Sequence, residues 1–134
     1  MTNSDLSPEI SRVIDANLNR LKEGIRVVED IMRYRDNNTQ ISRKLKSLRH
    51  LAKIENYLDF LAYRDSINDV LRPTQESELQ RLDITSILIA NLKRSQESAR
   101  VLEELFKLIA TDLSENFKHI RYELYDLEKE ILLS

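Results

Sequence analysis

The stretch ANLNRLKEGIRVVEDI, residues 16–31, recurs in the same chain as ANLKRSQESARVLEEL, residues 90–105. Eight of the sixteen aligned positions are identical. A repeated core needs only its apolar spacing to recur, so the return of polar residues indicates shared partners or a ligand, although slow divergence of a duplicated gene gives the same pattern. The identical polar pairs are Asn17/Asn91, Arg20/Arg94, Glu23/Glu97, Arg26/Arg100 and Glu29/Glu103.

Around each copy the apolar residues recur with a helical period. Ser7 and Pro8 begin the first helix, and the polar run at residues 36–39 ends it and begins a second helix whose apolar positions continue to Leu61. Asp83 caps a third helix that continues to Ile109. A fourth helix starts at residues 111–112, where Asp112 and Glu115 predict a variant capping box.

These helices predict one all-α domain over residues 1–134. Each half forms a helical hairpin, repeat one over about 8–62 and repeat two over about 83–133, joined by a loop over 63–82. Two such hairpins are expected to pack as a four-helix bundle with approximate two-fold symmetry. Connections as long as 63–82 are usually functional or disordered.

Composition limits the classes of function. The 21 basic residues nearly balance the 23 acidic ones, which argues against nucleic-acid and membrane partners. No cysteine, signal peptide or membrane span is present, so a cytoplasmic protein is expected. The single glycine, Gly24, cannot build a glycine-rich phosphate loop. The oligomeric state stays open, and a homo-oligomer is compatible with the sequence.

Asn17 and Gly24 fall within the apolar stripe of the first helix, and Asn91 and Ser98 take the same places in the second copy. A buried amide without a partner costs about 1 to 3 kcal/mol. The two asparagines are therefore expected either to pair across the bundle and fix its register, or to contact a ligand.

The arginines and glutamates of the motif, three residues apart, drift around the helix from the edge of the stripe to its back. Arg20 and Arg94 border the stripe, where a guanidinium can bind two phosphate oxygens. Arg26 and Glu29 lie further out, and a solvated ladder of ion pairs is favoured for them.

The long loop begins with Arg64, Asp65 and Asp69. Two carboxylates so close can bind a hydrated Mg²⁺ or accept a proton. The alternative is that they are ordinary turn residues.

Five segments in order resemble one known family. They are IDANLNRLKEGIRVVEDIMRY, KSLRH, YRDSINDV, IANLKRSQESARVLEELFKL and FKHIRYELYDLEK. The family is the all-helical domain that precedes thiamine-phosphate synthase in many bacteria, and it is assigned as a hydroxymethylpyrimidine phosphate kinase. The resemblance implies that the chain converts the monophosphate to hydroxymethylpyrimidine diphosphate with ATP and Mg²⁺, for thiamine biosynthesis.

The resemblance also implies roles for individual residues. The residues implied in catalysis are Arg20, Arg94, Arg64 and Asp65. Those implied in substrate binding are Asn17, Asn91, Glu23, Glu97, Arg26 and Arg100, and Mg²⁺ falls to Asp65 and Asp69. Asp15, Arg33 and Glu103 belong to the same family pattern.

The chain departs from that family at three points. Asn68 stands where a glycine is usual, and Asn19 replaces an aspartate. The 134 residues cannot hold the barrel of roughly 250 residues that performs thiamine-phosphate synthesis. The alternative hypothesis is a non-catalytic helical module that holds a pyrimidine phosphate or docks a thiamine-pathway enzyme such as thiamine-phosphate synthase.

Overall fold

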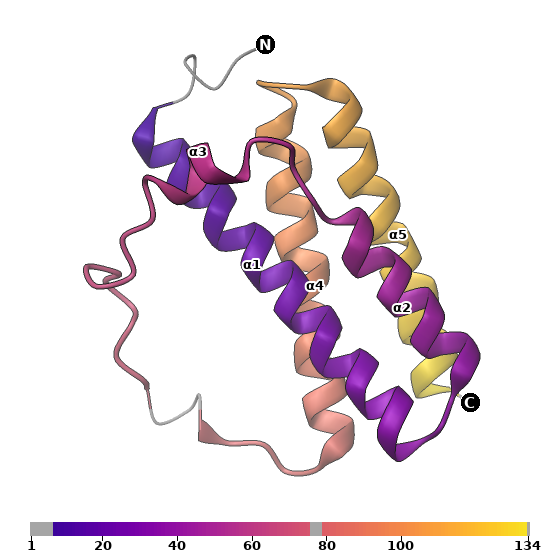
Figure 1. The fold of residues 1–134 in the computed structure, drawn as a ribbon. Helices are drawn as coiled ribbons and strands as arrows, with labels where there is room; N and C mark the ends of the chain where they lie inside the picture. Colours follow the sequence, from indigo (N-terminus) through magenta and orange to yellow (C-terminus); the bar gives the residue numbers. More distant parts are fainter. Residues whose placement is uncertain (1–6, 76–78, 134) are drawn as a thin grey trace.

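A computed structural model describes residues 7–75 and 79–133, and this part of the chain holds helices and connecting segments but no strand (Figure 1). The prediction of an all-α fold is therefore confirmed. The helices are α1 (Pro8–Asp30), which runs on into a π-helical turn, η2 (Ile31–Arg35), then α2 (Thr39–Leu51), α3 (Tyr57–Leu61), α4 (Ile84–Phe106) and α5 (Thr111–Leu132).

Four long helices form the bundle. α1 packs on both α2 and α4, α4 packs on α5, and α2 closes against α5. Figure 1 shows that α1 descends while α4 ascends beside it, so these two helices are antiparallel. The approximate two-fold symmetry of the repeats stays a prediction.

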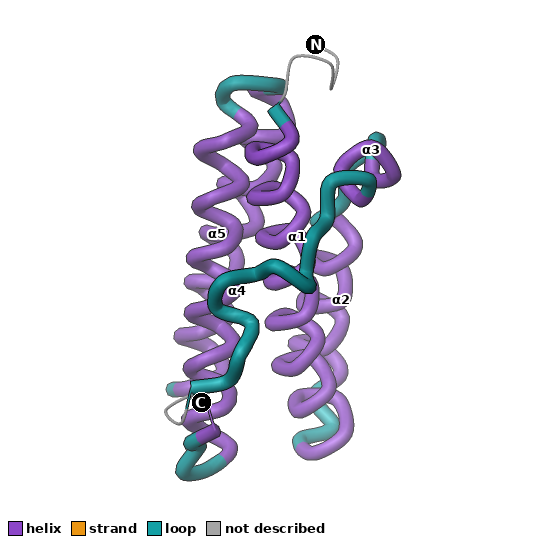
Figure 2. The backbone as a smooth tube through the Cα atoms, turned by 90° about the vertical axis from the view of Figure 1, so that its left-hand side faces the viewer, coloured by secondary structure: helices purple, strands orange, loops and turns teal. Residues whose placement is uncertain are grey.

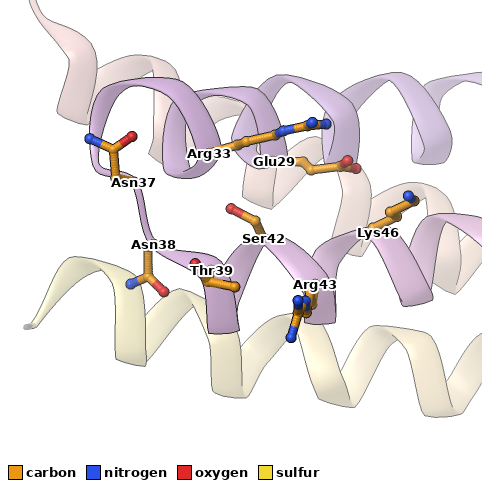
Figure 3. Close-up of a pocket in the computed structure, with 8 residues that line it drawn as sticks. All are labelled: Glu29, Arg33, Asn37, Asn38, Thr39, Ser42, Arg43 and Lys46. Carbon is orange, nitrogen blue, oxygen red and sulfur yellow. The ribbon is translucent and has the colours of Figure 1, made fainter.

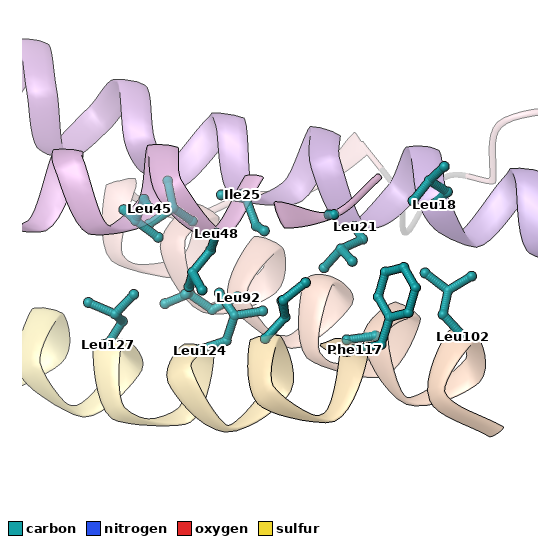
Figure 4. Close-up of a cluster of buried hydrophobic side chains, with 14 of the residues drawn as sticks. Leu18, Leu21, Ile25, Leu45, Leu48, Leu92, Leu102, Phe117, Leu124 and Leu127 are labelled. Carbon is teal, nitrogen blue, oxygen red and sulfur yellow. The ribbon is translucent and has the colours of Figure 1, made fainter. Parts of the chain in front are cut away.

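The core lies along the contact of α1 with α4, and α2 and α5 close over it (Figure 4). At Gly24 the two central helices are in close contact, because an added Cβ would collide with Ser95 Oγ and lie 3.0 Å from the carbonyl oxygen of Asn91. Ser95 Oγ also donates a hydrogen bond of 3.3 Å to the carbonyl oxygen of Leu21. The prediction that Gly24 belongs to the buried stripe is confirmed, and its small size sets the spacing of the two helices.

One buried ion pair joins the two helices of each hairpin. Glu29 of α1 accepts two hydrogen bonds, of 2.8 and 3.2 Å, from Arg49 of α2. Glu103 of α4 accepts one of 2.9 Å from Arg121 of α5. Both glutamates are almost fully buried, so the expectation of a solvated ladder was wrong for Glu29. It holds for Arg26, which is exposed and pairs with Asp30.

The predicted boundaries can be compared with the structure at the start of α4, the end of α2 and the start of α5. Asp83 caps α4 in a capping box with Ser86, as expected. The predicted helix through Leu61 is wrong, because α2 ends at Leu51, whose carbonyl oxygen accepts a hydrogen bond of 3.1 Å from Asn116 of α5. The box predicted at Asp112 is also wrong, since α5 begins after Ala110 without a side-chain cap.

α3 turns back over α1, and the chain then runs across the outside of the bundle to the start of α4 (Figure 2). Within the described residues no helix is long and apolar enough to cross a membrane.

Candidate functional site

A cavity of about 700 Å³ lies between the first half of α1 and the segment that follows α3. We call it the loop cavity. Its lining combines residues from the first copy of the polar motif with residues at the start of the long loop. The family resemblance implies a site made of residues from these two segments. The residues that line it are Glu9, Arg12, Val13, Asp15, Ala16, Asn17, Asn19, Arg20, Glu23, Arg64, Asp65, Ser66 and Asp69.

Asp15 fixes the loop in place. Its carboxylate is buried on α1 and accepts hydrogen bonds of 2.6 and 2.8 Å from Nε and Nη2 of Arg64. These bonds raise the pKa of Arg64, and Nη2 also donates to the hydroxyl of Tyr57 at 3.4 Å. A fork-to-fork pair of this kind fixes both position and orientation. The guanidinium of Arg64 was expected to bind phosphate, but the structure uses it first to hold the loop against α1.

Arg12 and Arg20 supply positive charge to the cavity. Both side chains are exposed at its edge, and neither forms an ion pair with a described residue. They stand eight residues apart, about two helical turns, and so share one face of α1. Sequence reasoning missed Arg12 because the repeat places Ser86 opposite it, although the spacing to Arg20 could have revealed it.

Asp65 and Asp69 bring two carboxylates to the opposite wall. Asp65 accepts hydrogen bonds from the backbone and side-chain nitrogens of Asn68, at 3.1 and 2.8 Å. These bonds, with a smaller contribution from the charge of Arg12, hold the pKa of Asp65 below its ordinary value. Asp69 accepts a hydrogen bond of 3.0 Å from the backbone nitrogen of Leu71. Both residues shape the turn, as the alternative interpretation expected, and both still line the cavity.

Asn17 connects the cavity with the interior. It is buried, and its Nδ2 donates a hydrogen bond of 2.9 Å to the carbonyl oxygen of Val13 on the same helix. Asn91 does the same with Ile87 on α4. Each amide thus bonds within its own helix, and the expected pairing across the bundle is not found. Oδ1 of Asn17 is left as an acceptor at the cavity wall.

The second copy of the motif does not line this cavity. None of its residues is among those that line the loop cavity, although the middles of the two copies meet where Gly24 of α1 packs on Ser95 of α4. Arg94 and Glu97 are exposed on α4, and Arg100 pairs with Glu103 and Glu104. The roles that the resemblance implies for Asn91, Arg94, Glu97 and Arg100 therefore stay predictions.

Comparison with known proteins identifies the family of the chain. A family model described as the ThiD2 family matches residues 12–130, nearly the whole described chain and most of the loop-cavity lining. The chain belongs to the ThiD2 family. No solved structure matches this ThiD2 chain.

Curated relatives of this ThiD2 chain bear the name thiamine-phosphate synthase. The protein from Synechocystis sp. is 40% identical over 124 residues, which cover 92% of this chain and 36% of the relative. The protein from Nostoc punctiforme is 36% identical over 124 residues, covering 92% and 35% respectively. The ThiD2 chain thus spans about a third of the length of the curated relatives it matches.

Proposed function

We propose that this chain acts in thiamine biosynthesis, where it phosphorylates hydroxymethylpyrimidine phosphate with ATP to give the diphosphate. The ThiD2 match and the names of the relatives support the pathway, and the resemblance of the motifs supplies the reaction. The observation that carries the proposal is the loop cavity, which sets two exposed arginines against two loop carboxylates.

The proposed reaction asks for charge and alignment rather than covalent chemistry by the protein. The bond between the terminal phosphorus of ATP and its bridging oxygen breaks, and ADP leaves with the electron pair. An oxygen of the substrate's phosphate forms the new bond to that phosphorus. Positioning and electrostatic stabilisation are the main contributions that a protein makes to such a transfer.

Arg12 and Arg20 are placed to bind the phosphate oxygens, since neither is engaged by a carboxylate of the described chain. Asn17 Oδ1 can accept a hydrogen bond from the substrate, and its other amide atom is held by the helix. Arg64 is a positioning residue, because it holds the loop through Asp15. With one glycine in the chain, the phosphates must be held by side chains and not by a glycine loop.

The carboxylates of Asp65 and Asp69 fit a Mg²⁺ ion that is also bound to the phosphates of a nucleotide. Mg²⁺ usually takes one or two carboxylates, with water and substrate phosphates completing its shell. Asp65 and Asp69 supply that number, and the described residues hold no group of three or more potential ligands that would make a closed protein site. The lowered pKa keeps Asp65 ionised at neutral pH. When bound, Mg²⁺ would neutralise phosphate charge.

The test is turnover by the purified full chain with hydroxymethylpyrimidine phosphate, ATP and Mg²⁺, with the diphosphate measured by ³¹P NMR. We expect product only when all three are present. Arg20→Ala should lower the rate about 100-fold, and Arg26→Ala, an exposed change outside the cavity, less than tenfold. Absence of turnover with wild-type protein would overturn the proposal.

A second candidate follows from the relatives, in which the matched region is about a third of a chain named thiamine-phosphate synthase. A unit of that kind can serve as a binding module that holds a pyrimidine phosphate or docks the synthase. A ligand at 100 times its Kd raises stability by about 2.7 kcal/mol. Stabilisation by the pyrimidine phosphate, with neither nucleotide binding nor turnover, would favour this candidate over the kinase.

A further inference from the structure

A second cavity, of about 350 Å³, lies where α1 turns into α2. We call it the turn cavity. Figure 3 shows Arg33 and Glu29 on the α1 side, with Thr39, Ser42 and Lys46 on α2 across from them. None of these residues belongs to the loop cavity.

The turn cavity carries an excess of positive charge. Arg33, Arg43 and Lys46 all line it, and none forms an ion pair within residues 7–75 and 79–133. The only carboxylate in its lining is that of Glu29, and both oxygens of Glu29 already accept hydrogen bonds from Arg49. Three cations therefore face one carboxylate that is already neutralised.

The start of α2 adds hydrogen-bond donors. α2 is 13 residues long, and its cap residue, Asn38, accepts from the backbone nitrogen of Ile41 at 3.0 Å. The amides of Thr39 and Gln40, in the first turn, have no partner in the described structure. Free amides and the helix dipole both favour an anion at such an end.

Ser42 shows that a partner is missing from the cavity. The residue is 9% exposed, and its Oγ is buried without a hydrogen-bond partner in the described chain. In Figure 3 this oxygen points into the space between the two helices. Counted from the paired arginines, Ser42 and Lys46 of α2 correspond to Ser114 and Lys118 of α5. Ser114 donates a 2.8 Å hydrogen bond to the carbonyl oxygen of Glu103. A buried hydroxyl normally has a partner, so Ser42 indicates a ligand atom that the chain itself does not provide.

The π-helical turn accounts for the difference between the two hairpins. In the first hairpin α1 passes into η2 before the chain turns at Asn37, whose φ of 50° is left-handed. In the second hairpin α4 ends at Phe106 without such a turn. Turns of the π type often occur at functional sites, and η2 contains Arg33, which reaches the turn cavity.

We propose that the turn cavity binds a phosphate group. Ser42 Oγ and the first amides of α2 donate hydrogen bonds to it, while Arg33 and Lys46 neutralise its charge and Arg43 borders it. Thirteen residues of helix separate Arg20 from Arg33, about 20 Å at 1.5 Å per residue. The group bound here is therefore distinct from the phosphates of the proposed transfer reaction, and the site goes beyond the proposed function.

The experiment is a titration of the ¹⁵N-labelled full chain with inorganic phosphate, followed by NMR. We expect saturable shifts at the amides of Thr39, Gln40 and Ser42. Lys46→Gln should weaken binding at least tenfold, since a charged hydrogen bond is lost. Lys118→Gln, an equal change of charge at the corresponding exposed position of α5, should change it less than twofold.

A second pair of variants separates binding from folding. Ser42→Ala should weaken phosphate binding while leaving the Tm equal or higher, because the buried hydroxyl has no partner in the free protein. Ser114→Ala should lower the Tm and leave phosphate binding intact. Shifts without saturation, shifts spread over all basic residues, or equal losses from Lys46→Gln and Lys118→Gln would overturn the proposal.

The source of the phosphate group is decided by parallel titrations with the pyrimidine phosphate and with ATP. Tighter binding of one of these than of inorganic phosphate at the Ser42 amide identifies a second molecule of that compound, bound outside the loop cavity, and equal binding identifies the free ion. The titration needs no turnover, so a failed kinase assay and a failed phosphate titration are separate results.

Discussion

The two hairpins of this chain carry the same polar motif but use it differently. In both, a buried glutamate of the long helix pairs with an arginine of the next helix, Glu29 with Arg49 and Glu103 with Arg121. The loop cavity, in contrast, is lined by residues of the first hairpin and the start of the long loop alone. At the position of Asp15 in α1, the aligned residue of α4 is Ile89, which is 41% exposed and cannot hold an arginine.

The comparison of the hairpins distinguishes motif residues with a structural role from motif residues that line the loop cavity. Glu29 and Glu103 each join the two helices of their own hairpin, so this glutamate is needed in both copies. Arg20 and Asn17 gain a cavity only because Asp15, outside the repeated stretch, anchors Arg64 and the loop above them. Recurrence of a residue therefore does not distinguish a ligand contact from a packing contact.

The largest effect is expected where the hairpins are alike. Arg121→Met leaves the buried Glu103 without its cation, and unfolding in denaturant should show a loss of about 3 to 5 kcal/mol. Arg49→Met should cost less, because the Arg49 side chain is 19% exposed and that of Arg121 is 10% exposed. A smaller loss for Arg121→Met than for Arg49→Met would contradict this ranking.

The next prediction concerns Arg20 and Arg94, which hold equivalent places in the motif. Arg20→Ala should reduce turnover about 100-fold, or about 2.7 kcal/mol, whereas Arg94→Ala should reduce it less than tenfold. Both side chains are exposed, so each variant should change stability by less than about 1 kcal/mol. Equal kinetic losses would show that the second copy contributes to the site after all.

Arg64→Ala tests the anchor that the second hairpin lacks. It leaves the buried carboxylate of Asp15 without the two hydrogen bonds that it accepts from Arg64, which should cost about 1.5 to 3 kcal/mol of stability. The loop after α3 should then be cut faster by protease in the variant. Unchanged proteolysis within this loop would mean that the ion pair does not hold it.

The smallest expected effect is a pH dependence confined to the loop. The pKa of Asp65 is lowered below 3.8, chiefly by hydrogen bonds from Asn68. The carboxylate's support of the turn is thus present above its unfolded pKa and lost as pH falls through the lower folded value. The Asn68 amide shift, followed by NMR, should change below pH 3.8 in wild type and stay flat in Asp65→Asn. A midpoint above 3.8 would contradict the prediction.

Much of the fold could be predicted from the periodic apolar residues and the helix caps. The caps at Ser7, Asn38 and Asp83 act within a few residues, and the structure confirms each start. The break after Leu51 was not predicted in this way, and the carbonyl group at that end is bonded by Asn116, which is 65 residues away along the chain. The burial of Glu29 was missed for the same reason, because its partner lies on another helix.

The site was predicted in part. Three motif residues of α1 and three loop residues named at the sequence level line one cavity, whereas Arg26 lies outside it. The six are Asn17, Arg20, Glu23, Arg64, Asp65 and Asp69. The second copy was assigned there too, because an alignment of repeats contains no information about direction. Arg12 escaped notice because it has no counterpart in the repeat.

The sequence by itself determined that the chain is helical, where most helices begin, and that its polar motif occurs twice. These properties depend on local spacing and on side chains a few residues apart. Only the tertiary structure decided that the two copies point to different places. The fold brings together Asp15 and Arg64, which are 49 residues apart in the sequence, and their ion pair holds the loop over the first copy of the motif and not over the second.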